Sequence, residues 1–192
     1  MKYQDQITAK NYINRKTDCH FSLAFEKIIL PLIKGKRVLD VGPGDGKYLE
    51  FFNNFNNESV GVDVSIPNIM HMKERGLNVV SADLNEKLPF NDETFDVVFM
   101  SHVLEHLDSP INSLRDTYRI LKEGGILVIC LPVYKSLISL LRSDHYFKKH
   151  STHLYVLDID SVKRLLQKTG FILKEIVFNI PGLRRFKVGG GY

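Results

Sequence analysis

The sequence predicts an α/β protein built on a doubly wound, mostly parallel sheet of seven strands, the last one short or missing, with helices on both faces. Short apolar runs bounded by turn residues recur along the chain, and helix-like patterns separate most of them. Such alternation is typical of parallel sheets. The runs 95–100 and 126–131 are almost continuously apolar, as expected of central strands that are buried on both faces.

The first half of the chain supplies three expected strands and one expected helix. The apolar run 37–41 predicts the first strand, and the sequence from Lys47 to Phe55 favours a helix after it. Shorter apolar runs at 59–62 and 78–81, each bounded by turn residues, predict the second and third strands.

The second half supplies three more strands, at 95–100, 126–131 and 171–178, and two helices. One helix is expected after Asp108, because Ser109 can cap it and proline suits its first turn. Its apolar residues recur at helical spacing: Ile111, Leu114, Tyr118 and Leu121. Gly124 and Gly125 should end the connection to the next strand. A later helix is expected from about Asp160 to Thr169.

Length and composition are those of one ordinary globular domain. The chain has 192 residues, a hydrophobic content of 44%, a net charge of +4 and two cysteines. These values predict a cytoplasmic protein with no membrane span, no secretory signal and no disulfide framework. The single domain, 1–192, divides into four expected parts: a helical cap (1–34), a ligand-binding core (35–131), a lid (132–157), and a C-terminal helix with a hairpin (158–192).

The turn after the first strand carries glycine at every second position: Gly42, Gly44 and Gly46. Glycine has no Cβ and adopts positive φ at little cost, so the backbone can come close to a ligand. The following helix points free N–H groups at the same place, as in doubly wound proteins that bind nucleotides. Asp40, at the end of the strand, would repel a pyrophosphate and attract a cationic amino group.

Asp63 ends the second expected strand, where an acidic residue suits a pair of ribose hydroxyls. A dinucleotide fingerprint would need a further glycine at position 47, where this chain has Lys47. An NAD-type oxidoreductase is therefore the alternative interpretation, and it is disfavoured. The chain also has no evident catalytic cysteine site.

Five segments in order resemble the class I S-adenosylmethionine-dependent methyltransferases, of the type 11 and ubiquinone–menaquinone kind: 38–46, 61–65, 81–90, 95–107 and 121–127. The resemblance covers roughly residues 35–180. It implies a Rossmann-like fold, S-adenosylmethionine as cofactor and S-adenosylhomocysteine as product. It places the ribose on Asp63, the adenine amino group on Asp83 and the adenine ring beside Leu84. The full set of implied cofactor contacts is Asp40, Gly42, Gly44, Gly46, Asp63, Val64, Asp83, Leu84 and Ser101.

The candidate catalytic residues follow the fourth strand. His102, Glu105 and His106 would share one face if their segment were helical. His106 or His102 is the candidate general base for a hydroxyl acceptor. A divalent metal held by Glu105, His106 and His153 is an open alternative. Quinone-pathway and small-RNA methyltransferases resemble the chain at Glu105 and His106, but they carry a glutamate where this chain has His102, and that difference disfavours the metal.

The lid gives the one hint about the acceptor. It is rich in basic residues, which favour a phosphorylated, carboxylated or glycan-linked acceptor; they are Arg142, His145, Lys148, Lys149, His150 and His153. We expect a small-molecule or glycan-type acceptor that is methylated at oxygen. Nucleic acid is not expected, because no RNA-binding signature is present. An exposed edge strand would favour a homodimer. A non-catalytic cofactor-binding partner subunit is the second alternative to an enzyme.

Overall fold

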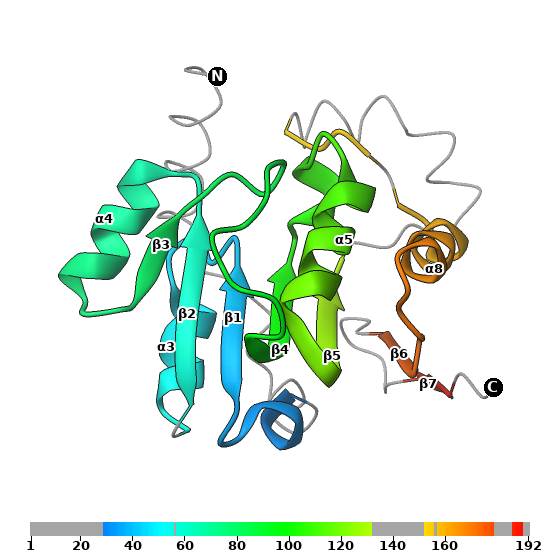
Figure 1. Ribbon diagram of the computed structural model, residues 1–192, viewed down its shortest axis with the longest axis horizontal. Coiled ribbons are helices and arrows are strands. Elements are labelled where there is room, and N and C mark those ends of the chain that lie inside the picture. Colours follow the sequence, from blue (N-terminus) through cyan, green and yellow to red (C-terminus); the bar gives the residue numbers. More distant parts are fainter. Residues whose placement is uncertain (1–28, 56, 132–151, 156, 179–185, 190–192) are drawn as a thin grey trace.

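The computed structural model describes residues 29–55, 57–131, 152–155, 157–178 and 186–189 (Figure 1). Its helices are a short helix at 29–33, α3 (Lys47–Asn53), α4 (Ile66–Glu74), the 3₁₀ helix η1 (Leu104–His106), α5 (Pro110–Ile120) and α8 (Ile159–Lys168). Its strands are β1 (Arg37–Val41), β2 (Glu58–Asp63), β3 (Val79–Ser81), β4 (Phe95–Ser101), β5 (Leu121–Cys130), β6 (Glu175–Phe178) and β7 (Phe186–Gly189).

Five strands form the main sheet in the order β3-β2-β1-β4-β5, and all neighbouring strands are parallel (Figure 1). The order turns back between β1 and β4, because the chain first builds outward to β3 and then returns to the other side of β1. Ligands of open α/β sheets bind beside such a reversal, at the carboxyl ends of the strands.

Helices cover both faces of this sheet, which confirms the doubly wound α/β fold. Val97 and Phe99 of β4 pack in one cluster with Phe52 of α3 and with the helix at 29–33. The intervening residue Val98 packs in another cluster, with Leu114 of α5 and with α8. Since successive side chains of a strand point to opposite faces, these two clusters are the two sides of one sheet.

The prediction for the fifth strand was wrong at its beginning. Gly124 and Gly125 lie inside β5, which starts at Leu121 rather than at Ile126. Leu121 pairs with Phe95, and Ile126 pairs with Val97. The residues of β5 between Leu121 and Ile126 therefore bulge out of the ladder. Leu121 is buried, and its packing holds the start of the strand in place.

The seven-stranded sheet is not found within the described residues. β6 and β7 are antiparallel and pair with each other in a separate two-stranded sheet. β7 has four residues and corresponds to the short last strand that the sequence predicted. The run 171–178 forms a strand only from Glu175 onward.

Several predictions fall on residues outside the described ranges. The cap at 1–34 is described only for its last residues, where 29–33 is helical. The lid is described only at 152–155 and 157, so its basic residues are not placed, His153 excepted. None of the helices in the described ranges has the length and apolar character that a bilayer crossing requires.

Candidate functional site

Three aspartates lie along the carboxyl edge of the sheet. Asp40 belongs to the end of β1 and Asp63 is the last residue of β2. Asp83 follows β3 by two residues. Because these strands are parallel neighbours, the three residues lie at the same edge of the sheet. We call Asp40, Asp63 and Asp83 the acidic edge.

The glycine turn has the backbone conformation that its sequence predicted. Gly42, Gly44 and Gly46 have φ values of 64°, 60° and 80°, in the left-handed region that favours glycine. A Cβ at Gly42 would lie 2.8 Å from Cγ2 of Val103, and one at Gly46 would lie 2.7 Å from Cγ of Met72. The turn therefore needs glycine for its packing as well as for its φ.

Asp63 ties this turn to the second strand. Its carboxylate accepts hydrogen bonds from the backbone N–H groups of Gly44, at 3.2 Å, and Ser65, at 2.8 Å. The side-chain amide of Asn68 donates to the same carboxylate at 3.4 Å. Burial raises the pKa of Asp63, and these N–H donors offset part of that effect. Asp63 thus shapes the turn before any ligand arrives.

Asp40 is the least compensated member of the acidic edge. It is 1% exposed, and its Oδ2 atom has no hydrogen-bond partner among the described residues. Burial raises the pKa of Asp40 well above its ordinary value, and the carboxylates of Asp63 and Asp45 raise it further. A cationic ligand with N–H donors would supply what this carboxylate lacks.

The remaining predicted cofactor residues surround the same edge. Asp83 is half-buried, and its Oδ1 atom accepts hydrogen bonds from the backbone and side chain of Asn85. Leu84 is buried in the core, whereas Val64 is 52% exposed beside Asp63. Ser101 ends β4, next to β1 in the sheet. An exposed apolar side chain next to buried acids offers a surface for a flat ring.

The candidate catalytic residues do not form the helical face that the sequence predicted. Only Leu104–His106 is helical, as one 3₁₀ turn. His102 lies outside it, with φ of 57°, which is unusual for a residue other than glycine. Its backbone N–H donates to the carbonyl oxygen of Cys130 at 2.9 Å, which fixes it at the end of β4.

A cluster of ionisable side chains nevertheless forms there. Glu105 is 2% exposed, and neither of its carboxylate oxygens has a hydrogen-bond partner in the described part of the chain. Nδ1 of His102 lies 3.3 Å from Oε1 of Glu105, within ion-pairing distance. The rings of His106 and His153 meet edge to face with their centroids 4.6 Å apart. The potential ligand atoms of Glu105, His106 and His153 all lie within 4.8 Å of one another.

Two contributors to the site were missed by the sequence analysis. Asn68 is buried and holds the carboxylate of Asp63. The carbonyl oxygen of Thr152 lies 2.9 Å from Nδ1 of His106. Asn68 lies five residues after Asp63, in the first turn of α4, which is a signal that could have been used. The contact of Thr152 joins residues 46 apart in sequence, so no local pattern could reveal it.

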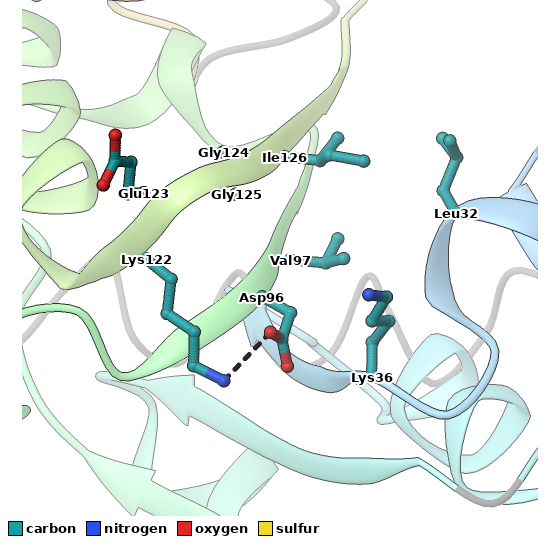
Figure 2. Close-up of a pocket in the computed structure, with 9 residues that line it drawn as sticks. All are labelled: Leu32, Lys36, Asp96, Val97, Lys122, Glu123, Gly124, Gly125 and Ile126. Carbon is teal, nitrogen blue, oxygen red and sulfur yellow. Dashed lines mark hydrogen bonds and ion pairs between the residues drawn. The ribbon is translucent and has the colours of Figure 1, made fainter.

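A separate pocket lies at the opposite edge of the sheet (Figure 2). It has a volume of about 150 Å³ and lies where β4 and β5 begin, beside the helix at 29–33. Leu32, Val97 and Ile126 form its apolar wall, and Lys122 donates to Asp96 at its rim. No predicted site residue lines it, and the strands bring their amino ends to it.

A family model described as a methyltransferase domain matches residues 14–175. The chain therefore belongs to this family of S-adenosylmethionine-dependent methyltransferases, as the sequence motifs predicted, and S-adenosylmethionine is its cofactor.

Among curated proteins, the chain is similar to protein MJ1123 of Methanocaldococcus jannaschii, with 30% identity over 70% of this chain and 64% of that one. It is 32% identical to a ubiquinone biosynthesis O-methyltransferase of Parvibaculum lavamentivorans, over 64% of this chain and 49% of the relative. It is also 32% identical to a demethylmenaquinone methyltransferase of Tropheryma whipplei, over 59% of this chain and 48% of the relative. The matches thus span about half to two thirds of these relatives.

Solved structures support the fold. A SAM-dependent methyltransferase from Archaeoglobus fulgidus superposes with a TM-score of 0.70 at 33% identity, covering 81% of this chain and 71% of that one. The 4+2 cyclase SpnF superposes with a TM-score of 0.67 at 20% identity, covering 92% of this chain and 72% of that one. The second similarity shows the fold alone, so the activity must be argued from the site.

The residues present fit the cofactor. S-adenosylmethionine carries an amino group and a sulfonium cation, and the only partly compensated carboxylate of Asp40 is suited to positive charge. Gly42, Gly44 and Gly46 have no Cβ atoms, so a ligand can come close to the backbone of the turn. Their own N–H groups already donate within the protein, to Val62, Asp63 and Pro43. Nothing in this arrangement favours the pyrophosphate that an NAD-type enzyme would bind.

Proposed function

We propose that the chain transfers a methyl group from S-adenosylmethionine to an oxygen atom of a small-molecule or glycan-type acceptor. The observation that supports this most is the acidic edge beside the glycine turn, which includes the buried Asp40, whose Oδ2 atom has no partner among the described residues. The names of both quinone-pathway relatives support a small-molecule acceptor, and that of the ubiquinone biosynthesis O-methyltransferase supports transfer to oxygen.

In this proposal, the acidic edge and the turn bind and orient the cofactor. Asp63 accepts the ribose hydroxyls while holding the turn, Asp83 accepts the adenine amino group, and Val64 packs on the ring. Asp40 neutralises the positive charge of the cofactor. The cofactor supplies the methyl group, whose transfer needs an in-line approach by the acceptor and exclusion of water, but no nucleophile on the protein.

The acceptor hydroxyl must also lose a proton, and a histidine supplies the base. His106 is suited to this, because a backbone carbonyl oxygen accepts the Nδ1 proton and leaves Nε2 with its lone pair. His102, about one third exposed beside the carboxylate of Glu105, is the other candidate base.

The deciding experiment measures the melting temperature of the full chain with S-adenosylhomocysteine and, separately, with NAD⁺. A ligand that binds only the folded state raises the melting temperature. We expect S-adenosylhomocysteine to raise it and NAD⁺ to leave it unchanged, and we expect Asp63→Ala to abolish the rise.

The matched control is Asp160→Ala on α8, since Asp160 is an exposed aspartate. This variant should keep the full rise. A rise with NAD⁺, or a rise that survives in Asp63→Ala, would contradict the cofactor assignment. A protein that binds the cofactor but transfers methyl groups to no acceptor would favour the partner-subunit alternative.

A second way to activate the acceptor is favoured by one observation, the approach of Glu105, His106 and His153. A divalent cation among these three groups would lower the pKa of a bound hydroxyl, so that it loses its proton at neutral pH. The buried, unpaired carboxylate of Glu105 fits a cation. His106 would then be a ligand, and His102 would be left as the base.

A further inference from the structure

Glu105, His106 and His153 would offer a cation two imidazole nitrogens and one carboxylate, which is a nitrogen-rich set. Their ligand atoms are at most 4.8 Å apart. Ligand atoms around a tetrahedral zinc ion lie roughly 3.4 Å apart, given bond lengths near 2.1 Å, so these side chains would have to close by up to roughly 1.4 Å to hold the ion. Magnesium instead requires oxygen ligands in near-octahedral geometry.

His102 contacts this set without belonging to it. Its Nδ1 lies 3.3 Å from Oε1 of Glu105, within ion-pairing distance of one carboxylate oxygen and not of the other. Both oxygens are buried, and neither has a hydrogen-bond partner among the residues described. The contact therefore favours a carboxylate that offers a metal one oxygen atom rather than two.

The backbone holds His102 in this position. Its φ of 57° is costly for a histidine, and such a conformation persists only where the surroundings enforce it. The hydrogen bond from its N–H to Cys130 and the buried neighbour Val103 both constrain it. His106 is held in the same manner, by the carbonyl oxygen of Thr152 at Nδ1, which leaves Nε2 to face a metal.

We propose that His102 is a positioning residue that orients Glu105 as a one-oxygen ligand and thereby makes the site selective for a nitrogen-preferring divalent cation such as zinc, against magnesium. This rests on the metal-assisted form of the proposed function. The ligand chemistry supports it, because imidazole suits zinc, cobalt and nickel, whereas magnesium and calcium prefer carboxylate and water.

The test uses the full chain, freed of metal by a chelator and then dialysed against Zn²⁺, Co²⁺, Mn²⁺ or Mg²⁺. We expect one Zn²⁺ or Co²⁺ per chain, bound roughly a hundredfold more tightly than Mg²⁺. Bound Co²⁺ also has a visible absorption spectrum that reports its coordination geometry. His106→Ala and His153→Ala should each abolish binding, whereas His71→Ala, on the exposed surface of α4, should not.

The variants at position 102 separate positioning from folding. His102→Ala should weaken Zn²⁺ binding about tenfold, as loss of a residue that orients a ligand does. His102→Gln keeps a donor toward Glu105 and should restore part of that loss. His102→Glu adds a second carboxylate and should raise the affinity for Mg²⁺ and Mn²⁺ relative to Zn²⁺.

The outcomes distinguish this inference from the proposals on which it rests. Equal affinity for Mg²⁺ and Zn²⁺ in the wild type, or unchanged selectivity in His102→Ala and His102→Glu, would overturn the role of His102. Absence of binding of any cation would overturn the metal site as well. In each case the thermal shift with S-adenosylhomocysteine, measured on the same samples, reports separately on the cofactor site and on folding.

Discussion

At the scale of single residues, Asp40 is a buried carboxylate whose charge the fold compensates only in part, through a backbone hydrogen bond from Leu49. Replacing it by asparagine removes that charge and keeps the size of the side chain. We expect Asp40→Asn to raise the melting temperature of the ligand-free chain by about 2–4 °C, which corresponds to about 1 kcal/mol. The same variant should lose most of its stabilisation by S-adenosylhomocysteine. A lower melting temperature for Asp40→Asn, together with unchanged binding of S-adenosylhomocysteine, would contradict the role of Asp40 as a destabilising carboxylate that binds the cofactor.

The effect of Asp40→Asn should also depend on pH. Because the pKa of Asp40 is higher in the folded state than in the unfolded chain, its ionisation destabilises the fold as pH rises through that window. Above the folded-state pKa the penalty is complete, and below the unfolded-state value it is absent. The stabilisation in Asp40→Asn should therefore be largest at pH 8 and should shrink on acidification. Urea unfolding of both chains between pH 5 and pH 8 measures it.

Gly42 and Gly76 make a matched pair, since both have positive φ but only Gly42 is crowded. Gly76→Ala should destabilise the chain by about 1 kcal/mol through its backbone conformation alone. Gly42→Ala should cost about 1–3 kcal/mol more, because its Cβ would meet Val103 at 2.8 Å. Urea unfolding gives both values. If the clash with Val103 causes the extra loss, adding Val103→Ala to Gly42→Ala should recover part of the lost stability. Equal losses of stability in Gly42→Ala and Gly76→Ala would exclude the clash as the cause.

At the scale of elements, α5 and α8 begin differently. The side chain of Asp158 accepts a hydrogen bond from the N–H of Ser161 at 2.6 Å, whereas Ser109 makes no such bond at the start of α5. This bond lowers the pKa of Asp158, so its stabilisation is lost as pH falls through the folded-state value. Asp158→Ala should lower the urea midpoint at pH 7 and Ser109→Ala should not. A larger effect of Ser109→Ala would show that capping is not the cause.

The elements also show what the sequence could reveal. β1, β2 and β4 follow their apolar runs within one residue, because continuous apolarity is a local property of buried strands. The start of β5 was missed because Leu121 continues the helical spacing of α5 and is placed by its packing against neighbours. The acidic edge was predicted because parallel strands end together. The cluster around Glu105 was only partly predicted, since the left-handed turn at His102 and the contact of Thr152 leave no pattern.

At the scale of the whole molecule, the described part of the chain contains two sheets of unequal size. The five-stranded sheet is covered by helices, whereas β6 and β7 form a two-stranded ribbon, which is marginal in stability by itself. Amide hydrogens of β1 and β4, the innermost strands, should exchange most slowly, and those of β6 and β7 should exchange far faster. Hydrogen exchange followed by mass spectrometry tests this. Equal protection would mean that the ribbon unfolds together with the larger sheet.

The predicted cofactor contacts lie between Asp40 and Ser101, whereas the histidine cluster comes from residues 102–106 and 152–153. In the proposed function, the earlier part of the chain binds the methyl donor and the later part acts on the acceptor. Recombination or drift in the later part could give new acceptors without rebuilding the earlier part. Because the two proposed functions lie in separate parts of the chain, exchanging the segments after β4 between relatives should change acceptor specificity and leave cofactor binding intact.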